Sequence, residues 1–167
     1  MIETAIELTE ARISGAEVQR IIEWGHVMLR HPVELLEGVR ETIESLNGRY
    51  RLILLTKGDL FDQESKLARS GLGEYFDAVE IVSAKNAATY RSIMQRHEVA
   101  PERFVMVGNS LRSDVLPALE AGGRAVHIPY ALTWAHERIE EQDLAGKEFV
   151  TLEKITHLPD WLTQRAG

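Results

Sequence analysis

The sequence predicts an α/β fold in which a parallel sheet is covered by helices on both faces. Short, near-continuous apolar segments of strand length recur along the chain, and stretches with helical periodicity separate them. Apolar residues make up 44% of the 167 residues, which is enough for a substantial core. Together these observations indicate a Rossmann-like core, in which ligands bind beyond the carboxyl ends of the strands.

Residues 1–31 predict a small helical unit that precedes this core. Apolar residues follow helical spacing along most of the segment. The run Ser-Gly-Ala-Glu places Ser14 at a helix N-cap and Glu17 three residues later, which is the pattern of a capping box. Because the pattern changes at Pro32, we divide the chain into this unit and an α/β core of residues 32–167.

Within the core, a first helix ends at Asn47-Gly48, a typical C-terminal signal. The strand Arg51–Thr56 follows, and then a helix that ends near Gly71. Further strands are expected at Ala78–Val82, Phe104–Gly108, Ala125–Ile128 and Phe149–Leu152, and a last turn of helix at residues 158–162.

Composition narrows the classes of function. The net charge is -7 and no basic run occurs, which argues against nucleic acid as a partner. The absence of cysteine excludes disulfides and thiolate chemistry. No signal peptide is recognisable, and no stretch approaches the ~20 apolar residues of a membrane span. We therefore expect a cytoplasmic protein without a membrane partner. The composition is still compatible with a small phosphorylated metabolite as ligand, because a local positive site can lie inside an acidic protein.

Polar groups follow three successive predicted strands, at the edge where such sheets bind ligands. They are Thr56, Lys57 and Gly58 after the first strand, Lys85 after the second, and Asn109 and Asp114 after the third.

Each of these groups also has an ordinary structural explanation. Thr56 could cap the helix that follows it, and Lys85 could be a solvated surface lysine. Asp114 could simply be a favourable acid near a helix N-terminus. Their occurrence after three successive strands favours a common site over three separate explanations.

Thr56, Lys57, Gly58 and Lys85 could together bind a phosphoryl group. Enzymes that transfer such a group act mainly by positioning it and neutralising its charge. The Thr56 hydroxyl can donate a hydrogen bond, and Lys85 supplies a compact positive charge. The amides of Lys57 and Gly58 can point at the same anion if a helix begins there. Asn109 and Asp114 offer the oxygen ligands that Mg²⁺ prefers.

The runs LILLTKGD, SAKN and VGNSLRSDV resemble motifs II, III and IV of the haloacid dehalogenase-like (HAD) hydrolases. The resemblance extends from Leu35 to about Trp134. It implies that the N-terminal helices form part of a helical cap. Most members of this family are phosphatases, and some are dehalogenases or mutases.

The resemblance also implies roles for individual residues. Thr56 would bind the substrate phosphoryl group, and Lys85 would hold that group and the nucleophile together. Asp114 would hold magnesium together with Asn109. Motif IV commonly has an acid at the position that Asn109 occupies here. Residues 130–137 would border the site, or form a surface loop.

The largest departure from the family is at motif I. No Asp-x-Asp run occurs among the 167 residues, and the DLFD run at 59–62 has the wrong spacing and follows the wrong strand. The family's nucleophile and a magnesium ligand would thus be missing, so magnesium binding is expected to be weak or absent. We interpret the sequence as truncated relative to a longer enzyme.

In the family, the strand that carries motif I lies between the strands that end here at Thr56 and Gly108. Its absence predicts unpaired backbone in the middle of the sheet. We consider three explanations: a truncated gene product, a second chain or exchanged strand that fills the position, or entry of the N-terminal run IETAIEL as a strand.

Two functional hypotheses follow. The first is a phosphatase-type HAD hydrolase, magnesium-dependent as a family and inactive in these 167 residues alone. The second is a non-catalytic module that binds phosphate or metal, or a subunit completed by another chain. A receiver-like signalling domain fits less well, because the order of the motifs after the Lys85 strand differs.

Overall fold

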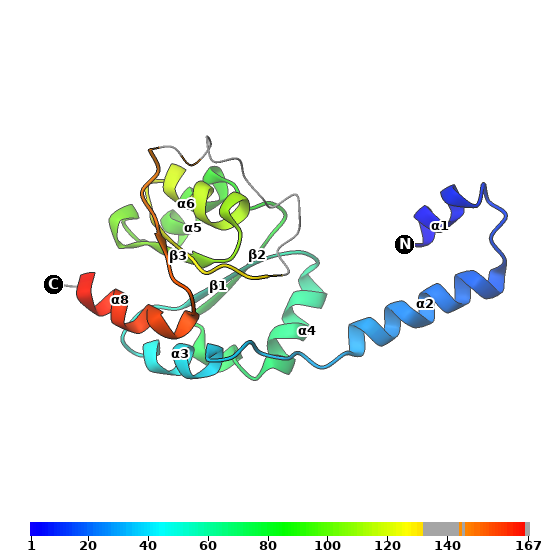
Figure 1. The fold of residues 1–167 in the computed structure, drawn as a ribbon, viewed down its shortest axis with the longest axis horizontal. Helices are drawn as coiled ribbons and strands as arrows, with labels where there is room; N and C mark the ends of the chain where they lie inside the picture. The colour runs from blue at the N-terminus through cyan, green and yellow to red at the C-terminus, as the bar shows by residue number, and fades with distance from the viewer. Residues whose placement is uncertain (132–143, 145, 166–167) are drawn as a thin grey trace. The chain divides into compact units, whose positions relative to one another are not determined.

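The computed structural model describes residues 1–131, 144 and 146–165 (Figure 1). It divides into two compact units, Met1–Glu34 and Leu35–Gly167. None of the described helices is both long and apolar enough to cross a membrane.

The first unit consists of α1 (Ile2–Leu8) and α2 (Gly15–Arg30). The predicted capping box at the start of α2 is confirmed: the Ser14 hydroxyl accepts from the Glu17 amide, and the Glu17 carboxylate accepts from the Ser14 amide at 2.8 Å. The N-terminal run IETAIEL is helical, so the expectation that it could enter the sheet as a strand is wrong. Its apolar residues have helical spacing, which cannot supply the alternation of a strand.

The second unit alternates strands and helices as predicted. The strands are β1 (Ile53–Lys57), β2 (Ala78–Val82), β3 (Val105–Gly108), β4 (Arg124–His127) and β5 (Val150–Thr151). The helices are α3 (Val39–Leu46), α4 (Leu60–Ser70), α5 (Ala87–Arg96), α6 (Leu116–Glu120) and α8 (Leu158–Arg165). Short helical turns are η1 (Gly73–Tyr75), η2 (Pro101–Arg103), η3 (Leu111–Val115, a turn of π-helix) and η5 (Ile155–His157).

The bounds of β1 differ from the predicted strand. It begins two residues later than Arg51, because the Leu52 amide donates to the Asp77 carboxylate at 2.7 Å instead of joining a ladder. It ends at Lys57 rather than at Thr56, since Lys57 still pairs with Val82 of β2.

All strand pairs are parallel, but the strands form two sheets. One has the order β1-β2 and the other β3-β4-β5. Among the described residues, neither sheet joins β1 to β3, so the described strands leave an interruption at the position predicted for the missing strand. Every residue of β1 and β3 is half-buried or exposed, whereas Ala125 and Val126 of β4 are buried. We refer to this break between β1 and β3 as the sheet interruption.

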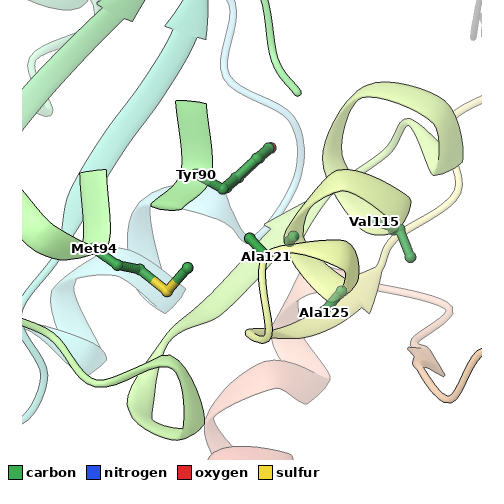
Figure 2. Close-up of a cluster of buried hydrophobic side chains, with 6 residues drawn as sticks. Tyr90, Met94, Val115, Ala121 and Ala125 are labelled. Carbon is green, nitrogen blue, oxygen red and sulfur yellow. The ribbon is translucent and has the colours of Figure 1, made fainter. Parts of the chain in front are cut away.

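Helices cover both faces of the two sheets (Figure 1). One hydrophobic cluster contains Tyr90 and Met94 of α5, Val115 of η3 and Ala125 of β4 (Figure 2). Ala118 of α6 belongs to the same cluster. On the opposite face, a second cluster joins Leu46 of α3, Leu158 of α8 and Val126 of β4.

Both clusters extend across the sheet interruption. Leu55 of β1 and Met106 of β3 pack against the first cluster, while Leu52, Val105 and Val107 pack against the second. Alternate residues of a strand point to opposite faces, so each face has one continuous apolar layer. The two sheets are therefore joined by shared side-chain packing rather than by backbone hydrogen bonds.

The buried carboxylate of Glu80 in β2 forms hydrogen bonds with residues at the end of α5. Glu80 is 8% exposed and accepts hydrogen bonds from Arg96 and, at 2.7 Å, from His97 Nε2. The Arg51 guanidinium only donates and lies 3.0 Å from His97 Nδ1, so Nδ1 accepts and Nε2 carries the hydrogen. Burial alone would raise the pKa of Glu80, but the hydrogen bonds from His97 and Arg96 outweigh it and hold the pKa below its ordinary value.

This network predicts an acid-sensitive contribution to stability. A folded-state pKa below the unfolded value stabilises the protein above the unfolded pKa, and this stabilisation is lost as pH falls through the folded pKa. Glu80→Gln replaces one of the two acceptors by a donor, so it should lower the free energy of unfolding by about 1–3 kcal/mol at pH 7. The deficit should shrink as pH falls from the ordinary glutamate range through the lowered folded-state pKa of Glu80, because the wild-type carboxylate then becomes protonated. Urea denaturation across this pH range measures it, with the exposed Glu102→Gln as the control.

Candidate active site

The predicted site residues lie at the carboxyl ends of β1, β2 and β3. Thr56 is the penultimate residue of β1, and Lys85 follows β2 by three residues. Asn109 follows β3 directly, and Asp114 lies in η3. Because the strands within each sheet are parallel, these ends belong to the edge where ligands bind in open α/β folds.

Lys85 and Asp114 form a buried ion pair that crosses the sheet interruption. Lys85 Nζ lies 2.8 Å from Asp114 Oδ1, and the two side chains are 14% and 6% exposed. Lys85 follows β2 in one sheet, whereas Asp114 follows β3 in the other. The alternative explanation of Lys85 as a solvated surface lysine is therefore wrong, because a charge so far removed from water requires a partner.

The turn after β3 is shaped around the Asp114 carboxylate. The Ser110 amide donates to Asp114 Oδ2 at 3.0 Å, and the Ser110 hydroxyl accepts from the Ser113 amide at 2.9 Å. Gly108 has no side chain, and a Cβ there would overlap the carboxylate. The Asp114 carboxylate does lie near the start of a helical turn, as the simpler explanation had it, but it is also committed to Lys85.

Tyr90, which belongs to the first hydrophobic cluster, also holds the turn after β3. Its side chain is fully buried, and its hydroxyl donates to the Ser113 carbonyl at 3.0 Å. Burial, with the nearby Asp114 charge, raises the pKa of the Tyr90 phenol. The phenol therefore stays protonated and keeps donating to the turn.

Thr56 does not cap the helix that follows it, so that alternative is wrong. The N-cap of α4 is Asp59, whose carboxylate accepts from the Asp62 amide at 3.1 Å. The Thr56 hydroxyl instead donates to Gln63 Oε1 at 2.8 Å. Among the described residues it makes no hydrogen bond to Lys85 or Asp114.

Sequence reasoning did not single out Gln63, because it lies on a helix and not at a strand end. A signal was present in the helical spacing. Leu60, Gln63 and Leu67 share one face of α4, which places an uncharged polar side chain in an otherwise apolar row.

The amides of Lys57 and Gly58 were expected to point at the anion if a helix began at these residues. No helix begins there. Helix α4 begins at Leu60, while Lys57 is an exposed residue at the end of β1. Gly58 turns the chain with a φ of 147°, and a Cβ at this position would come within 3.0 Å of Gln63 Nε2. Their role as anion donors stays a prediction.

The described residues do not make a magnesium site by themselves. Both Asp114 oxygens are engaged, one by Lys85 and the other by the Ser110 amide. Asn109 is exposed, and its backbone carbonyl oxygen, not its side-chain amide, lies 3.2 Å from His127 Nε2. In the described part of the chain, no three acidic or histidine side chains gather as metal ligands. Magnesium binding here would need a further carboxylate.

The parallel strands, covered by helices on both faces, form a Rossmann-like α/β core with a lysine–aspartate pair and a threonine at its ligand-binding edge. Residues 3–122 match the family model described as haloacid dehalogenase-like hydrolase. The chain therefore belongs to the haloacid dehalogenase-like hydrolases, as the three motifs predicted.

Solved and curated relatives agree with this assignment. A haloacid dehalogenase-like family hydrolase from Xanthomonas campestris is 42% identical, with a TM-score of 0.84 over 98% of this chain and 68% of that chain. The glyceraldehyde 3-phosphate phosphatase of Methanothermobacter thermautotrophicus is 32% identical over 68% of this chain and 51% of its own length. The N-acylneuraminate-9-phosphatase of Mus musculus is 30% identical over 74% of this chain and 52% of its own length. The chain thus spans about half the length of these curated relatives.

The buried ion pair leads to a prediction about stability. Lys85→Met leaves the Asp114 carboxylate buried without its cation, so the free energy of unfolding should fall by about 3–5 kcal/mol. Adding Asp114→Leu removes the stranded charge, and the double variant should lose less than Lys85→Met alone. Urea denaturation of each variant measures these differences.

The matched control is Lys66→Met. Lys66 also lies 2.7 Å from a carboxylate, Asp62, but its side chain is 49% exposed. Its loss should change the free energy of unfolding by about 1 kcal/mol or less. Equal losses for the two lysine variants would show that the Lys85 pair is not effectively removed from water.

Proposed function

We propose that the chain forms the phosphate-binding part of a HAD phosphatase that acts on small phosphorylated metabolites. The observation that carries this proposal is the buried Lys85–Asp114 pair at the ligand-binding edge, with Thr56 at the end of β1. A buried lysine held at such an edge is suited to neutralise the oxygens of a phosphoryl group. The curated relatives that match the chain are phosphatases, which supports the same class of substrate.

The proposed roles follow from the contacts of each side chain. Lys85 would provide the positive charge that draws in the phosphoryl group, and Asp114 would hold its ammonium in place. Thr56 would donate its hydroxyl hydrogen to a phosphoryl oxygen at the end of β1. The turn after β3, held by Ser110 and Tyr90, would keep these groups in register.

The nucleophile of the reaction is not among these groups. Asp114 is committed to Lys85, while Asp59 and Asp62 are held at the start of α4. A carboxylate on a strand that filled the sheet interruption would reach the same edge, next to Thr56 and Lys85. Such a carboxylate would also add, beside Asp114, an oxygen ligand of the kind that magnesium prefers.

We therefore expect no phosphatase activity from the 167 residues alone. With magnesium and an aryl phosphate such as 4-nitrophenyl phosphate, the chain should release product no faster than the double variant Thr56→Ala, Lys85→Ala. Circular dichroism should first establish that the double variant is folded. Turnover well above that of the double variant would show that the residues present already include a nucleophile.

The sheet interruption favours a second candidate function, a subunit that is completed by another chain. The edges of β1 and β3 that face the interruption carry amide and carbonyl groups outside both ladders. Such edges are templates for a further strand. A partner strand in this position would pair both edges at once and join the two sheets.

Self-association by strand exchange is the form of this candidate that can be tested with the chain alone. Sedimentation velocity should show a larger species as concentration rises, and amides of β1 and β3 should exchange with deuterium more slowly in that species. The amides of β2 should change little, because β2 does not border the interruption.

The control variant is Leu8→Ser with Trp24→Ser, which removes two exposed apolar side chains of the first unit. It should leave strand exchange intact. Association that this variant abolishes, without protection in β1 and β3, would place the contact on the first unit instead.

A further inference from the structure

The Thr56 hydroxyl is held by a short chain of hydrogen bonds at the start of α4. Thr56 Oγ1 donates to Gln63 Oε1 at 2.8 Å, and Gln63 Nε2 donates to Asp62 Oδ2 at 3.1 Å. Lys66 Nζ donates to the same Asp62 oxygen at 2.7 Å. Thr56 and Gln63 are both half-buried, so this chain lies between the end of β1 and the helix.

The direction of the Gln63 amide follows from its neighbour. The Asp62 carboxylate, paired with Lys66, can only accept hydrogen bonds, so the NH₂ end of Gln63 must face it. The carbonyl end of Gln63 therefore faces Thr56. A carbonyl oxygen only accepts, so the hydrogen between the two must come from the threonine hydroxyl.

This arrangement matters for anion binding because a hydroxyl has one hydrogen to donate. A phosphate oxygen also needs that hydrogen, and the remaining lone pairs of Thr56 would meet the anion unfavourably. The reverse arrangement, with the Gln63 NH₂ group toward Thr56, would free the hydroxyl hydrogen. It would also turn the Gln63 carbonyl toward the Asp62 carboxylate, where two acceptors would meet without a hydrogen between them.

We propose that Gln63, oriented by Asp62, is a positioning residue that holds the Thr56 hydroxyl away from the ligand and so limits anion affinity at the end of β1. This inference rests on the proposed phosphate-binding role of Thr56. An arriving phosphate must exchange the Thr56–Gln63 bond for one of its own. Gln63 thereby lowers the net free energy that the hydrogen bond between Thr56 and the phosphate contributes to binding.

The test measures the affinity of the full chain for inorganic phosphate by titration calorimetry. Gln63→Leu keeps a side chain of similar size but removes the competing acceptor, so phosphate should bind roughly twofold to tenfold more tightly, as expected for one released neutral hydrogen bond. Thr56→Val removes the hydroxyl and should weaken binding. In the Thr56→Val background, Gln63→Leu should have no further effect, because the hydroxyl that it releases is gone.

A second variant tests the orienting role of Asp62 without changing Gln63. In Asp62→Asn the amide can offer a hydrogen to Gln63, so Gln63 can turn its NH₂ group toward Thr56 and free the hydroxyl. Phosphate affinity should rise here as well. The control is Glu64→Gln, which removes the same charge from an exposed neighbouring position of α4 and accounts for the general electrostatic gain.

The outcomes separate this inference from the proposed function. One outcome would overturn only the role of Gln63. In that case Thr56→Val weakens phosphate binding, Gln63→Leu binds no more tightly than wild type, and Asp62→Asn binds no more tightly than Glu64→Gln. The proposed role of Thr56 would then still stand. If Thr56→Val leaves the affinity unchanged, the proposed role of Thr56 fails and the inference fails with it. An equal gain from Gln63→Leu with and without the hydroxyl would also overturn the inference, since the effect would not pass through Thr56.

Discussion

The ion pair between Lys85 and Asp114 is the contact on which the candidate site depends. Neither charge is stable at such low exposure without the other, so the pair fixes the distance between the segments that carry them. One segment follows β2 and the other follows β3, and these strands belong to different sheets. This ion pair, together with the Tyr90–Ser113 hydrogen bond and the shared side-chain packing, aligns two halves of the ligand-binding edge that backbone hydrogen bonds do not join.

The sheet interruption explains several features of the core at once. The strands that border it, β1 and β3, are only half-buried, although strands in the middle of such a fold are normally covered. Their side chains nevertheless pack into two apolar layers that run without a break over both faces. The fold is still that of the family, as the overlap with the Xanthomonas campestris structure shows. Packing thus preserves the arrangement at the position where the backbone ladder is broken.

Much of the fold could be predicted from the sequence because its signals are local. Strand β2 was expected at the residues where it lies, since its apolar run is short and clearly bounded. The capping box of α2 needs only Ser14 and Glu17, three residues apart on one chain segment. The strand-end polar groups were predictable too, because parallel strands bring successive carboxyl ends to one edge.

Two expectations that the structure overturned, the alternative that Thr56 caps α4 and the predicted start of β1, concern groups that compete for the same hydrogen-bond partner. Thr56 has an ordinary capping side chain, yet Asp59 caps α4 and Thr56 turns to Gln63. The start of β1 moved because the Asp77 carboxylate, 25 residues away, takes the Leu52 amide. Neither outcome can be read from spacing, because each depends on how distant groups compete for one hydrogen.

The sequence by itself determined the order of strands and helices, the family and the kinds of group available at the ligand-binding edge. These properties depend on apolar periodicity and on residue types at strand ends, which are local. Only the tertiary structure decided that Lys85 is buried against Asp114 and that Thr56 is held by Gln63. The reason is that hydrogen bonds and buried charges are satisfied by whichever groups the packed chain brings within reach.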